Sequence, residues 1–522
     1  MKLSPFLLLL AVTPAVISSC SSKADPDPGP SLTREQLMDP TSCIPCHKDH
    51  YSDWSGSMHA YAAVDPVFLA MNERGQRETN GALGTFCVNC HAPMAVAAVK
   101  AGQKLADVPA SLKGVTCFFC HSVDSIDPAR SNNNPLHLAD DGVLRGEYSD
   151  PVKNSAHRAI YSKLHDRDQA NSSGLCGTCH DIATQHGANI ERTFSEWQSS
   201  VFSRQLTPSD PRVGATCAQC HMHQSDSPVP IAQAPNVFAR RTHSHSFPGV
   251  DVAVTPGFPN VQHQQAQVQA ILSTTLQSAI CVLPLGPNSS ALRVIVDPVA
   301  TGHSFPSGST PDRRAWVEVV AYKAGAVIYQ SGVVPDDADV LKISDPDLWL
   351  FRDCLFDDQG KQVNMFWQAS SYESNTLPGL TTFDTLDPEY YKTHVIQNFP
   401  RDGNALIPGV PDRVTLRVRM RAMGIDFLDD LVASKDLDPA VRDKLAKIPP
   451  YTLGTHASGG YGSDAGVIEP YVEWTQAAAA AQGAVSTFVD PSGGQVTCVT
   501  TTSFKSNATR TPAVNHVKCK PF

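Results

Sequence analysis

The residues with the clearest chemical potential in this chain are cysteines and histidines that recur in one short pattern. The pattern Cys-x-x-Cys-His occurs five times, as CIPCH at 43–47, CVNCH at 87–91, CFFCH at 117–121, CGTCH at 176–180 and CAQCH at 217–221. Three kinds of chemistry use such a pattern: half of a zinc site, a thiol redox pair, and covalent attachment of c-type haem. In the third, two thiols add to the porphyrin's vinyl groups and the histidine ligates the iron.

The number of copies and the constant fifth residue decide between these alternatives. With 15 Cys and 19 His among 522 residues, random placement gives roughly 0.02 copies. Zinc sites pair Cys-x-x-Cys units without a constant next residue, and a thioredoxin-like enzyme carries a single pair. The sequence therefore predicts five haem c groups, with iron as their metal. The predicted attachment residues are Cys43, Cys46, Cys87, Cys90, Cys117, Cys120, Cys176, Cys179, Cys217 and Cys220, and the predicted first axial ligands are His47, His91, His121, His180 and His221.

The second axial ligand of each iron decides what that haem does, because a second histidine favours electron transfer and an open position binds substrate. The segment YSDWSGSMHA ends with His59 and Ala60. It resembles the Y-x-x-W-x-x-S-x-H-A segment of multihaem cytochromes related to the tetrahaem electron acceptors of ammonia oxidisers. That resemblance implies that His59 is a distal ligand, usually to another haem of the cluster. His157 occupies a similar position in such proteins, and His165 is its rival.

Two further segments supply candidate distal ligands. In RRTHSHSF, His243 and His245 stand two residues apart in an extended stretch, so they point opposite ways and one of them is expected to meet iron. We favour His243. The segment TGHSFPSGSTPDRRAW resembles the G-H-x-F/L-P-[TS]-G-x-x-x-R segment of multihaem cytochromes with a C-terminal β domain. The resemblance implies that His303 reaches into the haem domain. The fifth position stays open between side-chain ligands and an empty site, and its candidates are His186, His137, His223 and Met222.

The segments that must position these residues fall into two types. Residues 33–284 form the predicted pentahaem domain, where the motifs start 44, 30, 59 and 41 residues apart, too unevenly for a repeat array. The sequence between the motifs predicts short helices and loops, as expected if porphyrins supply much of the apolar core. Residues 285–425 alternate with period two, as in RVTLRVRMRA at 413–422, which predicts antiparallel strands of a β-sandwich-like domain with a tight turn at KAGA, 323–326. The fold class is therefore mixed.

The C-terminal region, 426–522, is predicted to be helical and then irregular. GIDFLDDLVASKDLDPAVRDKLAKI gives two short helices, the second capped by Asp438, and EWTQAAAAAQ at 473–482 predicts another. Four cysteines remain outside the motifs and the leader; Cys498 and Cys519 are offered as one pair, although sequence alone leaves the connectivity open. The arginines of DRR, 312–314, fit either a propionate or anion site or a solvated turn.

The first twenty residues read as an export signal with a short apolar run, FLLLLAV, and an ending, ISSC, that resembles the lipobox of bacterial lipoproteins. That resemblance implies acylation of Cys20, and residues 21–32 then form a polar tether. We expect a lipid anchor in the bacterial cell envelope, with the body facing the periplasm or the cell exterior. The net charge of −10 makes nucleic acid an unsuitable partner.

The sequence predicts a membrane-anchored electron-transfer protein with five mostly bis-histidine haems and redox proteins at the membrane as partners. The alternative is an oxidoreductase whose one open haem acts on a small nitrogen or sulfur compound. Pentahaem nitrite reductases carry a Cys-x-x-Cys-Lys motif, and all five motifs here end in histidine, which argues against that enzyme. We therefore expect an electron carrier rather than a substrate-specific enzyme, and we predict no catalytic residue.

Overall fold

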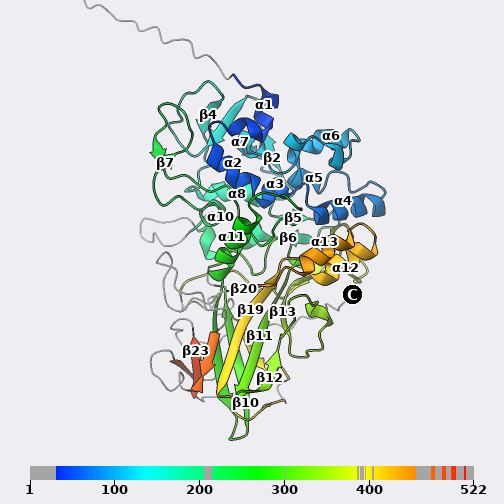
Figure 1. The fold of residues 1–522 in the computed structure, drawn as a ribbon, viewed down its shortest axis with the longest axis vertical. Helices are drawn as coiled ribbons and strands as arrows, with labels where there is room; N and C mark the ends of the chain where they lie inside the picture. Colours follow the sequence, from blue (N-terminus) through cyan, green and yellow to red (C-terminus); the bar gives the residue numbers. More distant parts are fainter. Residues whose placement is uncertain are drawn as a thin grey trace, which may run out of the picture.

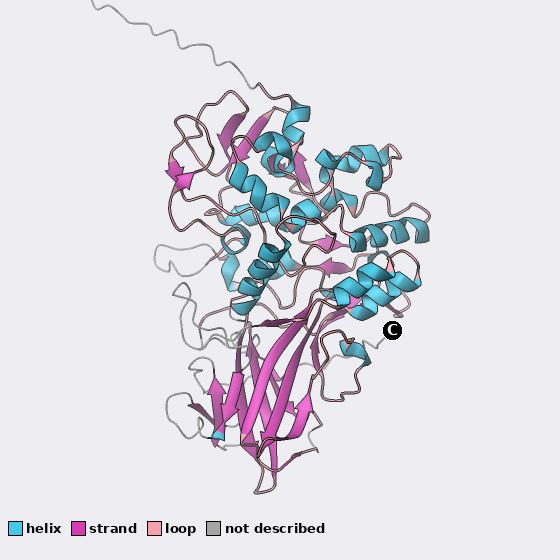
Figure 2. Ribbon diagram, in the orientation of Figure 1, coloured by secondary structure: helices cyan, strands magenta, loops and turns pink. Residues whose placement is uncertain are grey.

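The computed structural model separates the chain into a helical end that contains the five motifs and an end built of β-sheets (Figures 1 and 2). The described residues are 31–204, 214–298, 300–384, 387, 389, 393, 395–402, 405–453, 472–476, 485–489, 495–500 and 511–512. The leader and most of the predicted tether, residues 1–30, lie outside them. No helix among the described residues meets the length and hydropathy that a membrane span requires.

The motif region consists of short elements. Its helices are α1 (Arg34–Met38), α2 (Lys48–Ser55), α3 (Met58–Tyr61), α4 (Pro66–Glu78), α5 (Val88–His91), α6 (Val96–Lys100), α7 (Cys117–Ser122), α8 (Ser173–Gly177), α9 (Thr193–Ser199), α10 (Cys217–His221) and α11 (Val261–Ser273). Four two-stranded pairs lie between them: β1 (Val123–Ile126) with β2 (Leu136–Leu138), β3 (Val143–Gly146) with β4 (Arg158–Tyr161), β5 (Ile182–Ala183) with β6 (Asn189–Glu191), and β7 (Val229–Pro230) with β8 (Ala239–Arg240).

Two large sheets dominate the other end. One has the order β22-β23-β9-β10-β17-β24 with β18 on β10, and the other has the order β12-β11-β19-β20 with β13 on β11 and β21 on β19. The strands of the first are β9 (Gln277–Pro284), β10 (Ser289–Asp297), β17 (Val395–Phe399), β18 (Ile407–Pro408), β22 (Val485–Val489), β23 (Gln495–Thr500) and β24 (Thr511–Pro512). Those of the second are β11 (Arg314–Lys323), β12 (Ala326–Ser331), β13 (Trp349–Phe351), β19 (Arg413–Arg421), β20 (Tyr451–Leu453) and β21 (Val472–Thr475). A three-stranded sheet, β15-β14-β16, comprises Gln362–Val363, Asp353–Phe356 and Ser371–Ser374.

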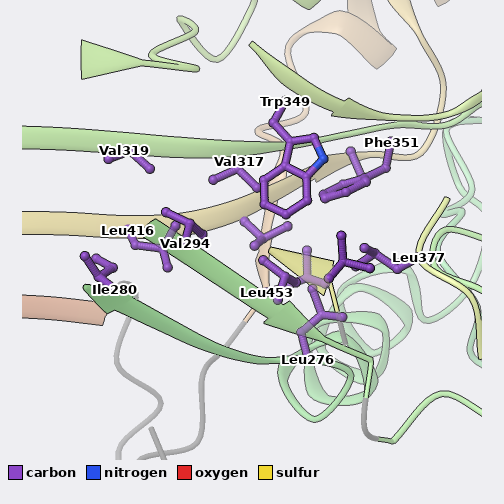
Figure 3. Close-up of a cluster of buried hydrophobic side chains, with 14 of the residues drawn as sticks. Leu276, Ile280, Val294, Val317, Val319, Trp349, Phe351, Leu377, Leu416 and Leu453 are labelled. Atoms are coloured by element: carbon purple, nitrogen blue, oxygen red, sulfur yellow. The ribbon is translucent and has the colours of Figure 1, made fainter. Parts of the chain in front are cut away.

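The two large sheets share one apolar core, which Figure 3 shows in close-up. On β19 the alternating side chains Val414, Leu416, Val418 and Met420 are buried in it, as the period-two pattern predicts. The strand pair β11–β12 turns at Ala324 and Gly325, whose φ angles of 50° and 79° are both positive. Positive φ at both central residues is the requirement of a type I′ hairpin turn, and it accounts for KAGA.

A pair of helices connects the two ends of the molecule. They are α12 (Ile425–Ala433) and α13 (Pro439–Ala446), the second capped by Asp438 as predicted. Phe427 and Leu431 of α12 pack with Val67 of α4 in one buried cluster. The helices that follow the β strands therefore pack against the motif region.

Buried ion pairs reinforce this junction. Arg314 is fully buried and binds Asp426 through two hydrogen bonds of 3.0 and 2.6 Å. Arg313 binds Asp251 through two of 2.7 Å. The arginines of the DRR segment are thus engaged with carboxylates inside the protein, and neither sequence-based alternative, an anion site or a solvated turn, describes them.

The structure bears on two predictions for the C-terminal region, the helix at 473–482 and the pairing of Cys498 with Cys519. Residues Glu473–Thr475, predicted as the start of a helix, belong instead to strand β21, which pairs with β19. Cys281 and Cys354 each take part in a disulfide, and the register places Cys498 opposite Cys281 on the neighbouring strand. Cys519 lies outside the described residues.

Candidate haem-binding centres

Each motif forms a helical turn that collects its three reactive side chains on one face. In motif 1 the amide of His47 donates to the carbonyl of Cys43 at 2.8 Å, and His91 and His180 make the same bond to Cys87 and Cys176 at 3.1 Å. Residues i, i+3 and i+4 share a helix face, which is where two thiols and one imidazole must lie to hold a single porphyrin. All ten motif cysteines are free of disulfides, so their thiols are available for attachment.

The imidazole of each motif histidine is oriented by a partner on Nδ1. Four of the five donate to backbone carbonyls: His47 to Ile231 at 2.9 Å, His91 to Ala62 at 3.1 Å, His121 to Arg145 at 2.6 Å and His221 to Pro248 at 2.8 Å. A carbonyl oxygen only accepts, so Nδ1 carries the proton and Nε2 is left to bind iron. His180 differs, because its Nδ1 lies 2.8 Å from the carboxylate Oε1 of Glu191.

Four motif histidines face a second imidazole from a distant part of the chain. The ring centroids are 6.2 Å apart for His47 and His157, 6.3 Å for His180 and His59, 6.4 Å for His121 and His245, and 6.5 Å for His221 and His303. Two imidazole nitrogens that each lie about 2 Å from one iron place the ring centres about 6 Å apart. The spacing of all four pairs therefore fits an iron between them, and the donor set fits bis-histidine haem c.

The distal candidates are positioned by their own local bonds. The Nδ1 atoms of His157, His245 and His303 lie 2.9–3.2 Å from the carbonyls of Arg158, His243 and Ser304, which leaves Nε2 free in each.

His303 comes from the loop after β10 and crosses to the motif region. Its neighbour Ser304 donates its amide to Glu196 at 3.2 Å, and Ser307 donates its hydroxyl to the same carboxylate at 2.7 Å. These bonds tie the loop to α9.

The structure changes the preferred member of the pair His243 and His245. His245 lies opposite His121, whereas Nδ1 of His243 lies 3.1 Å from Glu147. The two side chains have different neighbours, and it is the second that lies beside a motif histidine. His165, the rival of His157, donates from Nε2 to the carbonyl of Cys120 at 2.8 Å, and its ring centroid lies 5.7 Å from that of His121. His165 is therefore a second neighbour of motif 3, with its Nδ1 unbonded.

His91 of motif 2 is the exception. Among the described residues, the ring in contact with it is Phe68, stacked at 4.0 Å and 5°, and no second histidine makes a ring contact with it. The other candidates for a fifth ligand do not approach it by any such contact: His186 and His223 are exposed, His137 pairs with Asp124, and Met222 follows motif 5.

Thiols of different motifs lie close to one another. The thiols of Cys43 and Cys117, of Cys90 and Cys179, and of Cys176 and Cys217 are near enough for one thiol of each pair to shift the pKa of the other. Motif 1 therefore lies beside motif 3, and motif 4 lies beside both motif 2 and motif 5.

Burial keeps most of these imidazoles neutral, the form that binds iron. It lowers the pKa of His47 and of His221 to about 4 and that of His59 to about 3. Burial acts on His180 in the same direction, but the Glu191 carboxylate outweighs it and raises the pKa of His180 to about 9.

Two comparisons with known proteins gave matches. A family model described as cytochrome c554 and c-prime matches residues 42–122, a span that includes the first three motifs. Over that span the chain is similar to multihaem c-type cytochromes. The crystal structure of a penta-heme cytochrome c552 from Thermochromatium tepidum matches with a TM-score of 0.51 and 20% identity, over 81% of this chain and 97% of that one. At that identity the likeness shows a shared fold. A comparison with curated proteins found no match.

Proposed function

We propose that this cytochrome is an electron-transfer protein with five covalently bound haem c groups, four of them bis-histidine, held at the membrane by an N-terminal lipid. The observation that carries the proposal is the set of four opposed imidazole pairs at 6.2–6.5 Å. Haem iron supplies one-electron chemistry. The polypeptide orients the imidazoles, and burial keeps most of them neutral. The five motifs and the likeness to a penta-heme cytochrome support the number five.

The test is the mass and the spin state of the purified holoprotein. We expect a mass increased by five haems, and electron paramagnetic resonance (EPR) of the oxidised protein with four low-spin ferric signals. Fewer than five haems in fully processed protein would contradict the number. Five haems with most of them high-spin would instead contradict the bis-histidine ligation.

A second candidate function, oxidoreductase activity at motif 2, is favoured by one observation: among the described residues no imidazole faces His91. An open haem there predicts one high-spin ferric EPR signal that disappears on addition of cyanide. The double variant Cys87→Ala/Cys90→Ala is the matched control, because it removes that attachment site alone and should abolish the signal. An all-low-spin spectrum would leave electron transfer as the remaining function.

The proposed anchor indicates which side of the motif region faces the membrane. The amides of Ser31 and Leu32 donate to the carbonyls of Ser155 and Ala156 at 2.7 and 3.2 Å, directly before the distal candidate His157. The tether therefore joins the body beside motif 1, and we propose that this end faces the membrane and its redox proteins. Cys20→Ser should move the cytochrome from the membrane fraction to the soluble extract, whereas Ser19→Ala should not. Retention of Cys20→Ser in membranes would reject the lipid anchor.

A further inference from the structure

One motif histidine has a different kind of partner from the other four. The Nδ1 atoms of His47, His91, His121 and His221 are bonded to backbone carbonyls, whereas His180 is bonded to Oε1 of Glu191 at 2.8 Å. A carboxylate is a stronger acceptor than a carbonyl, because it carries a full negative charge. All five motifs therefore offer a histidine ligand, but the group that is bonded to its Nδ1 differs at motif 4.

The carboxylate is held in place by its strand. Glu191 ends β6 and is paired with Ile182 of β5, which begins two residues after His180. The neighbouring Arg192 is engaged elsewhere: it binds Asp353 at 2.7 Å and stacks over the ring of Tyr372 at 4.1 Å. The side chain of Glu191 is 19% exposed and that of His180 is 51% exposed, so the carboxylate itself is largely shielded while water reaches the imidazole.

We infer that Glu191 is a positioning residue that lowers the reduction potential of the haem at motif 4 below those of the other three bis-histidine haems. This inference rests on the proposed function. A carboxylate behind a ligating imidazole makes that imidazole a stronger electron donor and so favours the oxidised metal. The step affected is the addition of one electron to one ferric iron, and no proton leaves His180 or Glu191.

The position of motif 4 between other motifs determines what a low reduction potential there would do. Its cysteines lie beside Cys90 of motif 2 and Cys217 of motif 5. A low potential at this junction makes it a site that passes electrons on rather than one that retains them. Electrons then reside on the neighbouring centres.

The experiment is a redox titration of the full-length holoprotein, followed by visible absorption and EPR, for the wild type and Glu191→Gln. The amide oxygen still accepts a hydrogen bond from His180, so geometry is preserved while the charge is removed. We expect one midpoint to rise by an amount that makes its reduction about tenfold more favourable, or about 59 mV for one electron. One low-spin EPR signal should change its g values, and the other four midpoints should stay in place.

Glu147→Gln is the matched control. Glu147 lies 3.1 Å from Nδ1 of His243, a histidine that faces no motif imidazole, so all five midpoints should stay unchanged. If every midpoint is also unchanged in Glu191→Gln, or if all shift together, the inference is overturned. A wild-type protein without haem would instead defeat the proposed function.

A second variant covers the case in which Glu191→Gln does not accumulate. His59 faces His180, and His59→Met should raise the potential of that one haem, because methionine ligation raises potentials. The midpoint that moves identifies the motif 4 haem in the wild type. That midpoint should be the lowest of the four bis-histidine haems, and any other rank would overturn the inference.

Discussion

The two ends of the molecule obtain their cores in different ways. The β sheets bury one continuous apolar cluster from both layers, from Ile280 and Val294 on one to Leu416 on the other. In the described part of the motif region, the buried apolar side chains form smaller separate clusters, such as the one around Phe68 and Val88. Some of its functional side chains are exposed: the side chain of His180 is 51% exposed, and Cys220 is exposed as well.

The difference shows which part of the fold is determined by side chains and which by the prosthetic groups. Apolar burial stabilises by about 25 cal/mol per Å², and the β end provides its own apolar surface. In the motif region, porphyrins would supply the surface that covers the exposed motif residues. We therefore expect the motif region to depend on haem and the β end to be independent of it.

The largest expected effect comes from withholding haem. If the chain is exported in cells without the machinery for haem attachment, residues 31–250 should become protease-sensitive while the strands between 277 and 421 resist. Limited proteolysis with mass spectrometry of the fragments measures this, with holoprotein as the control. Equal resistance of both ends would mean that the motif region folds on its side chains alone.

A smaller effect is expected at the junction between the two ends. Arg314→Met removes the partner of the buried Asp426 and leaves an uncompensated charge, which should cost about 3–5 kcal/mol in the free energy of unfolding. Urea unfolding of the holoprotein measures it. The control is Arg442→Met, which breaks a partly exposed pair with Asp429 and should cost about 1 kcal/mol or less. Equal losses would show that the junction does not depend on the buried pair.

The third prediction concerns pH and the helix beside motif 2. Burial raises the pKa of Asp65, the cap of α4, from 3.8 to about 7. Because the folded pKa exceeds the unfolded one, the stability associated with the protonated form is present below about pH 4 and is lost as the pH rises through 7. Asp65→Asn keeps the cap acceptor without the charge, so its stability should be greater at pH 8 by up to about 4 kcal/mol.

Urea midpoints at pH 5 and pH 8 for both proteins measure this prediction. The wild type should lose stability between the two values, and Asp65→Asn should lose less. Asp107→Asn, at an exposed position, is the control and should follow the wild type. A wild type whose stability is unaffected by pH in this range would contradict the assignment of a buried, protonated Asp65.

Local patterns predicted the elements of this chain better than its long-range contacts. The alternation in β19, the turn at Ala324 and the cap at Asp438 each follow from a few adjacent residues, and the structure has all three. The segment at 473–475 contradicts its helical prediction because pairing with β19 decides its conformation. Tertiary contacts override weak local preferences.

At the candidate haem centres, too, local spacing was predictable and long-range contacts were not. Spacing alone marks the motif residues, and it also indicates that His243 and His245 point apart. It does not say which of them faces His121, because that depends on how a loop lies against a distant helix. Glu191 carries no sequence signal at all: it is one acidic residue in a short strand, and its meaning comes from the 2.8 Å contact with His180.

The proximity of His303 to His221 means that a residue from the second half of the chain lies at the last motif of the first half. His303, the distal ligand that we propose for the last motif, follows that motif in the chain and lies beside it where the loop at 302–308 bonds to α9. The low-spin spectrum of this one site would then appear only once the C-terminal half has folded and docked. Docking of the two halves would then be detectable as a change in the visible absorption spectrum.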